Sequence, residues 1–251
     1  MQERLVALVT GGSRGIGAET ALALADQGYD VALTYRNKAT RAEGVAAAII
    51  RQGREALVLC CDITQAQQVA HLFQQISQWR THLDILVLNA SGGMERDLVA
   101  ADPDYPMHIN RDAQLALVEA ALPLLSPGGV IVFVTSHWAH LYGKMQQLPA
   151  YEPVAESKYV GEQALRALQP DLDARGLRLL VVTGDLIEGT ITPKLLERTA
   201  PGLIKQRRTT QGALPTARDM GREIVRAALN RTLVSGTTIV IGASLSSMLE
   251  P

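Results

Sequence analysis

Residues 5–17 read Leu5-Val6-Ala7-Leu8-Val9-Thr10-Gly11-Gly12-Ser13-Arg14-Gly15-Ile16-Gly17. A short apolar run thus passes through a glycine-rich turn into residues 15–27, which have the residue spacing of a helix. Glycines at such a turn let the backbone come close to a phosphate, and the free N–H groups at the helix start attract the anion. The stretch therefore predicts a βα unit that binds a nucleotide.

The alternation that begins here continues along the chain. Apolar, β-branched runs predict strands at 5–10, 31–35, 56–60, 85–88, 130–135, 177–182 and 238–241. Helical spacing of alanine and leucine predicts helices at 15–27, 41–52, 66–79, 111–125 and 154–168. Apolar strands that alternate with helices favour a parallel sheet covered on both faces. We therefore expect an α/β, Rossmann-type, doubly wound three-layer sandwich with a seven-stranded parallel sheet.

We expect residues 1–251 to form a single domain, because this length suits one large α/β unit and no convincing linker occurs. Residues 184–215 differ from the rest, being rich in Thr, Gly and Pro with one short helical pattern at 193–199. Such segments near the carboxyl ends of the strands often cover a substrate in open α/β folds. We predict a substrate-lid insertion at 184–215, with an ordinary surface insertion as the alternative.

Composition limits the class of partner. A net charge of −1 gives no electrostatic reason to bind nucleic acid or an anionic membrane, and no apolar run has transmembrane length. The first four residues lead directly into the first strand without the shape of a signal peptide, and the adjacent Cys60 and Cys61 are interpreted as reduced core residues. We expect a cytoplasmic protein. No metal site is expected, because His137 and His140 have no evident third ligand.

The spacing of the loop is T-G-x-x-x-G-x-G, which resembles that of the short-chain dehydrogenase/reductase (SDR) family, and the resemblance extends through nearly the whole chain. Leu88-Asn89-Ala90-Ser91-Gly92 is similar to the N-N-A-G segment of the family, and Asp62-Ile63 to its adenine-contacting pair. Three of the four catalytic positions of the family correspond to Asn110, Ser136 and Lys158. The resemblance implies a nicotinamide cofactor held by Gly11, Ser13, Arg14, Gly15, Ile16, Gly17, Asp62, Ile63, Asn89, Ala90 and Lys158.

The segment after the sixth strand departs from the family. Thr183-Gly184-Asp185-Leu186-Ile187-Glu188-Gly189-Thr190 replaces the usual Pro-Gly start. The resemblance still implies that the backbone of Ile187 meets the carboxamide and that Thr190 reaches the pyrophosphate. Asp185 and Glu188 are expected to be solvated, with polar contacts to the substrate as the alternative. It also implies a homotetramer or homodimer formed through the helices predicted at 111–125 and 154–168.

The end of the second strand predicts the choice of cofactor. An NAD-preferring site usually has an acidic side chain here to bind the ribose hydroxyls, but the sequence is Tyr35-Arg36-Asn37-Lys38. Arg36, with Arg14 from the glycine loop, is suited to bind a 2′-phosphate through planar, bidentate guanidinium contacts. We therefore predict NADPH/NADP+ as the cofactor; two solvated surface arginines are the alternative.

The catalytic motif departs from Y-x-x-x-K, because Val154 occupies the tyrosine position before Lys158. The nearest upstream tyrosine is Tyr151, which gives Y-x6-K, and Pro153 is typical of a first helical residue. Seven residues are nearly two helical turns, so Tyr151 and Lys158 would share a face even on a continued helix. The longer spacing resembles the NADPH-dependent enoyl-acyl-carrier-protein reductases of the same superfamily. His140 and Tyr142 remain alternative proton donors.

Hydride transfer to a carbonyl needs a proton donor for the developing oxyanion. We expect Lys158 and the oxidised nicotinamide to lower the pKa of Tyr151, and Ser136 to orient the substrate oxygen. The resemblance implies that Lys158 also holds the nicotinamide ribose and that Asn110 helps retain a water in a proton relay.

The sequence predicts an NADPH-dependent oxidoreductase that transfers hydride to a ketone or to an enoyl thioester, and these two acceptors stand equal. A small molecule or an acyl thioester is therefore the expected substrate. The alternative belongs to another class: a non-catalytic Rossmann protein that senses NADP(H) or binds a partner. Val154 is the feature that favours it.

Overall fold

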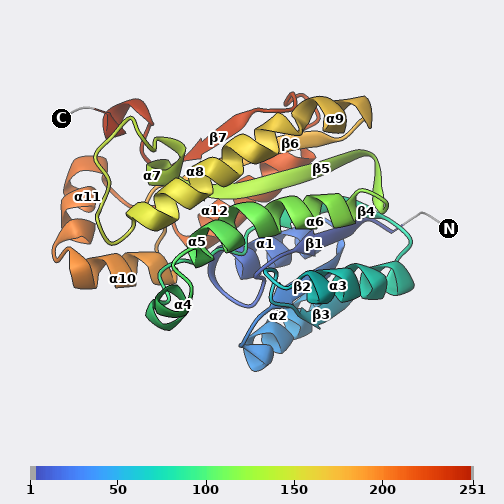
Figure 1. Ribbon diagram of the computed structural model, residues 1–251. Coiled ribbons are helices and arrows are strands. Elements are labelled where there is room, and N and C mark those ends of the chain that lie inside the picture. Colours follow the sequence, from blue (N-terminus) through green and yellow to red (C-terminus); the bar gives the residue numbers. More distant parts are fainter. Residues whose placement is uncertain (1–3, 250–251) are drawn as a thin grey trace.

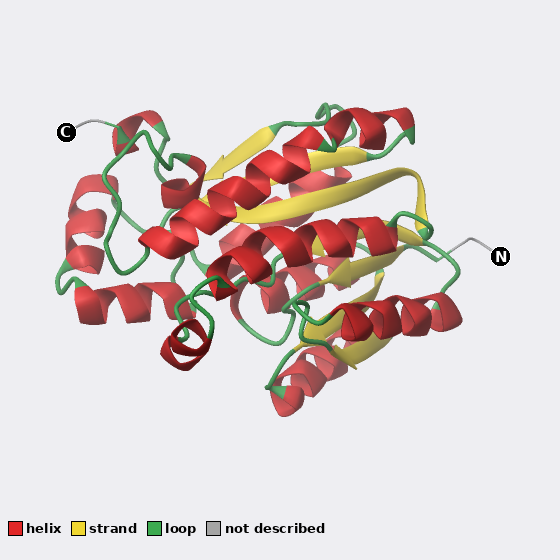
Figure 2. Ribbon diagram, in the orientation of Figure 1, coloured by secondary structure: helices red, strands yellow, loops and turns green. Residues whose placement is uncertain are grey.

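The computed structural model describes residues 4–249 and is built on one sheet of seven strands. The strand order is β3-β2-β1-β4-β5-β6-β7, and every neighbouring pair is parallel. The strands are β1 (Val6–Val9), β2 (Asp30–Tyr35), β3 (Ala56–Cys60), β4 (Leu83–Leu88), β5 (Leu125–Ser136), β6 (Arg178–Gly184) and β7 (Thr238–Ile241). The predicted α/β sandwich with a seven-stranded parallel sheet is confirmed (Figures 1 and 2).

Helices cover both faces of the sheet. On one face α3, α6 and α8 pack side by side, and on the other α1 packs between α2 and α12 (Figure 1). Their bounds are α1 (Gly15–Asp26), α2 (Ala39–Arg51), α3 (Ala66–Trp79), α6 (Ala113–Ala121), α8 (Glu152–Ala167) and α12 (Ala217–Leu229). The shorter helices are α4 (Arg96–Ala101), α5 (Tyr105–Met107), α7 (His137–His140), α9 (Gln169–Ala174), α10 (Ile191–Thr199), α11 (Leu203–Gln211) and the 3-10 turn η2 (Ser246–Met248).

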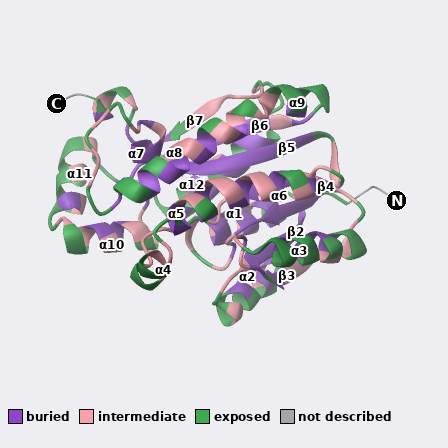
Figure 3. Ribbon diagram, viewed as in Figure 1, coloured by how far each residue is buried: buried purple, intermediate pink, exposed green. Residues whose placement is uncertain are grey.

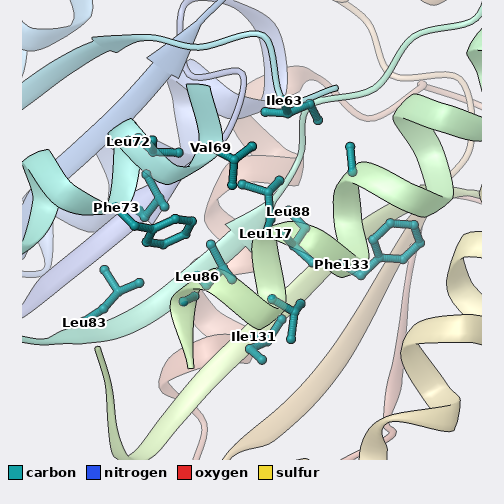
Figure 4. Packing of buried hydrophobic residues seen from close by; sticks show 14 of the residues in the cluster. Ile63, Val69, Leu72, Phe73, Leu83, Leu86, Leu88, Leu117, Ile131 and Phe133 are labelled. Atoms are coloured by element: carbon teal, nitrogen blue, oxygen red, sulfur yellow. The ribbon is translucent and has the colours of Figure 1, made fainter. Parts of the chain in front are cut away.

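The sheet has one apolar core on each face, because successive side chains of a strand point to opposite faces. Leu8 of β1 belongs to the core under α3 and α6, whereas its neighbour Val9 belongs to the core under α1 and α12. The central strands are buried on both sides (Figure 3). Figure 4 shows the first core, in which Leu72 and Phe73 of α3 approach β4 residues such as Leu86.

The predicted helix at 111–125 is wrong at both ends. A π-helical turn, η1 (His108–Asp112), precedes α6, and β5 already begins at Leu125. A π turn contains an extra residue per turn and often lies at a functional site; here it contains Asn110. The early start of β5 is accompanied by a register shift against β4 between Leu83 and Ile85.

Two helices form the segment 184–215, where the sequence indicated one. The pattern at 193–199 corresponds to α10, and α11 follows it. In Figure 1 both lie near α7, beyond the carboxyl end of β5. The single domain at 1–251 stays a prediction, and residues 1–3 and 250–251, which it includes, lie outside the described residues. Within residues 4–249, no helix has both the length and the apolar character needed to cross a membrane.

Candidate active site

The glycine loop lies where the order of the strands reverses. From β1 the chain builds the sheet outward through β2 and β3, and it then returns to place β4 on the other side of β1. The loops after β1 and β4 are joined, because Asn89 Nδ2 donates to the Thr10 carbonyl oxygen at 2.9 Å. Gly11 and Gly15 have φ angles of +68° and +56°, in the left-handed region that favours glycine. Open α/β folds bind ligands at this edge.

Gly17 and Gly15 have different roles in this loop. A Cβ atom on Gly17 would lie 2.4 Å from the Gly11 carbonyl oxygen and 2.5 Å from Asn89 Nδ2. These are distances that real Cβ atoms do not show, so Gly17 is required for packing α1 against the loop. The nearest neighbour of a Cβ on Gly15 would be Thr190 Cγ2 at 3.6 Å. Gly15 therefore leaves room beside Thr190, as a phosphate site needs.

We expect Gly17→Ala to destabilise the protein by about 1–3 kcal/mol, the usual cost of overpacking. Gly44→Ala is the matched control, because Gly44 lies in α2 with nothing within 4 Å of an added Cβ. That change should instead stabilise by up to about 1 kcal/mol. Thermal unfolding of the cofactor-free proteins measures both. Equal melting temperatures for Gly17→Ala and the unmodified protein would contradict the packing role.

The loop after β6 carries two further predicted cofactor residues. Thr190 precedes α10 and lies beside Gly15. Its Oγ1 donates to the Ile187 carbonyl oxygen at 2.8 Å. The Ile187 side chain is buried in the core, so only its backbone is available for a carboxamide. The structure thus brings Thr190 to the glycine loop, although the family's usual proline is missing.

The remaining predicted cofactor residues surround the same edge. Arg14 is exposed, Ile63 is buried, and Asp62 Oδ1 accepts hydrogen bonds from the backbone N and the Oγ1 of Thr64. A pocket of about 400 Å³ opens between β2, β3 and α4. Its lining includes Arg36, Cys60, Asp62, Glu95 and Asp97. The partly buried Ser13 and Ala90 belong to the loops after β1 and β4, and the partly buried Ile16 is the second residue of α1.

Cys60 corrects one expectation about the core. Both thiols are free, but only Cys61 is buried, while Cys60 is exposed and lines this pocket. The reason is position: Cys60 is the last residue of β3, the outermost strand.

Ser136 and Tyr151 meet at the carboxyl end of β5. Ser136 Oγ and Tyr151 Oη lie 3.0 Å apart, and one hydroxyl donates to the other. Ser136 ends β5 and caps α7, where its Oγ also accepts from the Ala139 backbone N at 3.3 Å. Tyr151 directly precedes α8, and Glu152 and Pro153 begin that helix as the sequence indicated. The Y-x6-K tyrosine is therefore the phenol that the fold brings to the serine.

Lys158 lies two turns into α8 and is buried. Burial lowers the pKa of the Lys158 ammonium to about 8, against a smaller opposing effect of the Glu162 carboxylate. Burial also raises the pKa of Tyr151, and the hydrogen bond from Ser136 opposes it. The expected lowering of the Tyr151 pKa by Lys158 is therefore not found in the protein alone, because loss of water around the phenol dominates.

Asn110 joins three segments of the site. Its Oδ1 accepts from Ser91 Oγ at 2.9 Å, and its Nδ2 donates to the Gly92 carbonyl oxygen and to Ser157 Oγ of α8. A Cβ on Gly161 would lie 2.0 Å from the Asn110 carbonyl oxygen. The Asn110 side chain is thus used in the protein itself, and its carbonyl lies against α8 one turn beyond Lys158.

The alternative proton donors are engaged elsewhere. His140 Nδ1 lies 2.9 Å from both carboxylate oxygens of Glu162. The Tyr142 ring packs on Tyr159, with centroids 5.9 Å apart. His137 is fully buried between Thr183 Oγ1 and the Ala243 carbonyl oxygen. Among the described residues, no group of three or more His, Cys, Asp or Glu side chains is placed to hold a metal ion.

Asp185 corrects a further expectation, because it is buried rather than solvated. Arg207 Nη2 of α11 donates to Asp185 Oδ2 at 2.6 Å, and the Arg207 guanidinium lies 5.6 Å from the Trp138 ring centroid. Arg208 makes a comparable contact with Glu188 at 2.6 Å. These ion pairs hold α11 against the loop after β6. They could not be predicted from the sequence, because α11 was not among the expected helices.

An apolar cluster surrounds Tyr151. Leu196 of α10 and Leu203 of α11 belong to it, so both helices of the 184–215 segment contribute to the surroundings of the phenol. Its other buried members are Trp138, Ala139, Leu141, Val154, Ala155, Leu186, Leu214 and Met248. The site thus combines two hydroxyls and one ammonium with an apolar wall.

The chain matches the family model described as short chain dehydrogenase over residues 5–199. It belongs to the short-chain dehydrogenase/reductase family. This confirms the predicted family and the predicted enzyme class, an oxidoreductase that uses a nicotinamide cofactor. The SDR chain is 32% identical to "Hydroxynaphthalene reductase arp2" of Aspergillus fumigatus over 80% of its own length and 72% of that relative's. It is 34% identical to "Hydroxynaphthalene reductase-like protein Arp2" of Metarhizium anisopliae. That match covers 66% of this chain and 62% of the relative.

Solved SDR structures share the fold over nearly the whole chain. A short chain dehydrogenase from Burkholderia cenocepacia in complex with NADP has a TM-score of 0.83 at 29% identity, covering 97% of this chain and 98% of that one. The reductase LugOII, which catalyses keto-reduction at C1 during lugdunomycin biosynthesis, has a TM-score of 0.80 at 26% identity. The match covers 95% of this chain and 96% of that one.

Proposed function

We propose that this SDR protein is an NADP(H)-dependent ketone reductase with Tyr151 as its proton donor. The observation that carries the proposal is the 3.0 Å separation of Ser136 Oγ and Tyr151 Oη. Two hydroxyls at this distance can both bond one carbonyl oxygen. A protein that only sensed the cofactor would need neither hydroxyl, so this pair favours an enzyme over the alternative of a non-catalytic sensor.

The residues present fit a nicotinamide dinucleotide. Gly11 and Gly15 form the turn that a pyrophosphate needs, and Thr190 lies beside Gly15. Arg36 lies in the pocket at the end of β2 and supplies the positive charge for a 2′-phosphate. We propose that the other family positions (Ser13, Arg14, Ile16, Gly17, Asp62, Ile63, Asn89, Ala90, Lys158 and Ile187) complete this site. A bound cofactor supplies the hydride for the carbonyl carbon.

The side chains of the protein supply the proton and stabilise the charge. Tyr151 donates its Oη proton to the oxygen of the carbonyl as negative charge develops there, and Ser136 donates a hydrogen bond to the same oxygen. The raised pKa of Tyr151 keeps the phenol protonated, which is the form that reduction requires. The Lys158 ammonium stabilises the tyrosinate that remains. Asn110 positions α8 and the loop after β4 against each other.

The apolar wall indicates the substrate class. Trp138, Leu196 and Leu203 favour a flat, apolar ring system over a charged chain. The Aspergillus fumigatus relative is a hydroxynaphthalene reductase, and LugOII reduces a keto group. We therefore propose a cyclic ketone on an aromatic or polycyclic skeleton, with α10 and α11 as the substrate lid. An enoyl thioester is the second acceptor to test.

The substrate proposal is tested by following NADPH absorbance with α-tetralone and with crotonyl-coenzyme A. We expect NADPH consumption with the bicyclic ketone and none above background with the thioester. The opposite pattern would show that the reaction is enoyl reduction, as in the reductases whose Y-x6-K spacing this chain resembles.

The pH dependence of the reaction should follow Lys158. Because its pKa is about 8, the ammonium is lost as the pH rises through about 8, so kcat/KM for reduction should fall above that value. Lys158→Arg is the control, because guanidinium stays charged and the fall should disappear. If kcat/KM of the unmodified protein stays level up to a pH of about 10, the ordinary pKa of lysine, this assignment is contradicted.

The proposal includes a cytoplasmic homodimer or homotetramer. Its interface would use α6 and α8, which pack together on one face of the sheet. Sedimentation velocity measures the assembly, and a monomer at all concentrations would contradict this part.

A further inference from the structure

The guanidinium of Arg36 is already bound within the protein. Arg36 Nη1 donates to Tyr105 Oη of α5, and Arg36 Nη2 donates to Glu95 Oε1 at 3.3 Å. Glu95 directly precedes α4 and lines the same pocket as Arg36. The Glu95 carboxylate thus already binds the Arg36 guanidinium, which a 2′-phosphate would need as its partner.

The second carboxylate oxygen of Glu95 binds the segment that lies beside the apolar cluster around Tyr151. Glu95 Oε2 accepts from the backbone N of Gly93 at 2.8 Å and from that of Met94 at 3.2 Å. Met94 packs against the apolar cluster that contains Tyr151. A Cβ on Gly93 would lie 3.0 Å from Val154 Cγ2. One carboxylate therefore joins the arginine of the cofactor pocket to Gly93 and Met94, which lie beside the apolar cluster that contains Tyr151.

A phosphate dianion and this carboxylate cannot both be stable beside one guanidinium without strong like-charge repulsion. Two more carboxylates, Asp62 and Asp97, line the same pocket and add to the repulsion. Arg36 and Glu95 side chains are about a third exposed, at 30% and 34%, so their ion pair is weak enough to be exchanged.

We propose that Glu95 is a built-in competitor for the 2′-phosphate of NADP(H), and that its displacement from Arg36 releases residues 93–95 beside the apolar cluster that contains Tyr151. This inference rests on the proposed cofactor site at Arg36. It gives Glu95 the role of a specificity-determining residue, which lowers the affinity for NADPH and not for NADH. It also makes the segment beside that cluster respond to the phosphate.

Glu95→Gln separates charge from hydrogen bonding, because glutamine keeps an oxygen that can accept from Gly93 and Met94. Fluorescence titration of the cofactor-free protein should show NADPH binding about two- to fivefold tighter in this variant, the range of an exposed ion pair. The affinity for NADH should stay the same. Asp97→Asn is the matched control: it removes an exposed carboxylate from the same pocket and should change the NADPH-to-NADH ratio less.

A third variant distinguishes failure of the inference from failure of the proposed function. Arg36→Met should abolish the NADPH preference. If it does, and Glu95→Gln leaves the ratio unchanged or acts no more than Asp97→Asn, the inference is overturned and the cofactor site stands. If Arg36→Met leaves the ratio unchanged, the cofactor site itself is wrong.

Amide hydrogen exchange tests the release of the loop. At saturation, Gly93 and Met94 should exchange faster with NADP+ bound than with NAD+ bound, because only the former displaces Glu95. Equal exchange in the two complexes would overturn the release of residues 93–95.

Discussion

Tyr151→Phe should lower the turnover of a verified substrate about a hundredfold or more, the usual scale for losing a general acid. The ring stays in the apolar cluster with Trp138, so folding and NADPH binding should persist. Only the oxygen 3.0 Å from Ser136 Oγ is removed. Steady-state kinetics at saturating NADPH measures the effect on kcat.

Tyr142→Phe is the matched control for this change. It removes the same atom from a partly exposed ring that packs on Tyr159, and kcat should stay within about twofold. If Tyr151→Phe retains full turnover, the proton comes from another group. His140, held by Glu162, would then be the first to substitute.

Arg36→Met should weaken NADPH binding by about one to two orders of magnitude. A hydrogen bond to a charged group contributes about 1.5–3 kcal/mol, and methionine keeps a long flexible chain without the charge. NADH binding should change little, because NADH has no phosphate at that position. Titration of both cofactors measures the two affinities.

Lys38→Met is the control for the general loss of positive charge. Lys38 is exposed two residues further along and does not line the pocket at Arg36. It should have a small, salt-sensitive effect. Equal losses for Arg36→Met and Lys38→Met would mean that NADPH senses overall charge rather than a guanidinium in the pocket.

The elements with strong local signals could be predicted from the sequence. Each of the seven strands contains an apolar run, and the central strands, which are buried on both faces, require such runs. The glycine loop is equally clear, because positive φ angles at Gly11 and Gly15 need glycine. Tyr151 could be selected because Pro153, which favours the first turn of a helix, follows two residues later, and Tyr151 directly precedes α8.

The errors have a different physical origin. In the π turn, the Asn110 carbonyl closely approaches Gly161 of α8, which is a tertiary contact that local spacing does not reveal. Arg36 with Glu95, and Asp185 with Arg207, are 59 and 22 residues apart, so spacing cannot reveal them. One missed element did have a signal: Thr216 and Asp219 form a capping box at the start of α12.

NADPH with deuterium in place of both hydrogens at C4 of the nicotinamide distinguishes carbonyl reduction from enoyl reduction. A bicyclic conjugated enone offers a carbonyl carbon and a β-carbon in one molecule, so a single product analysis separates the two reactions. With Ser136 and Tyr151 on the carbonyl oxygen, we predict deuterium on the carbinol carbon, detected by mass spectrometry and NMR. Deuterium on the β-carbon, with the ketone intact, would show that hydride goes to the enoyl carbon and that the proposed ketone reduction is wrong.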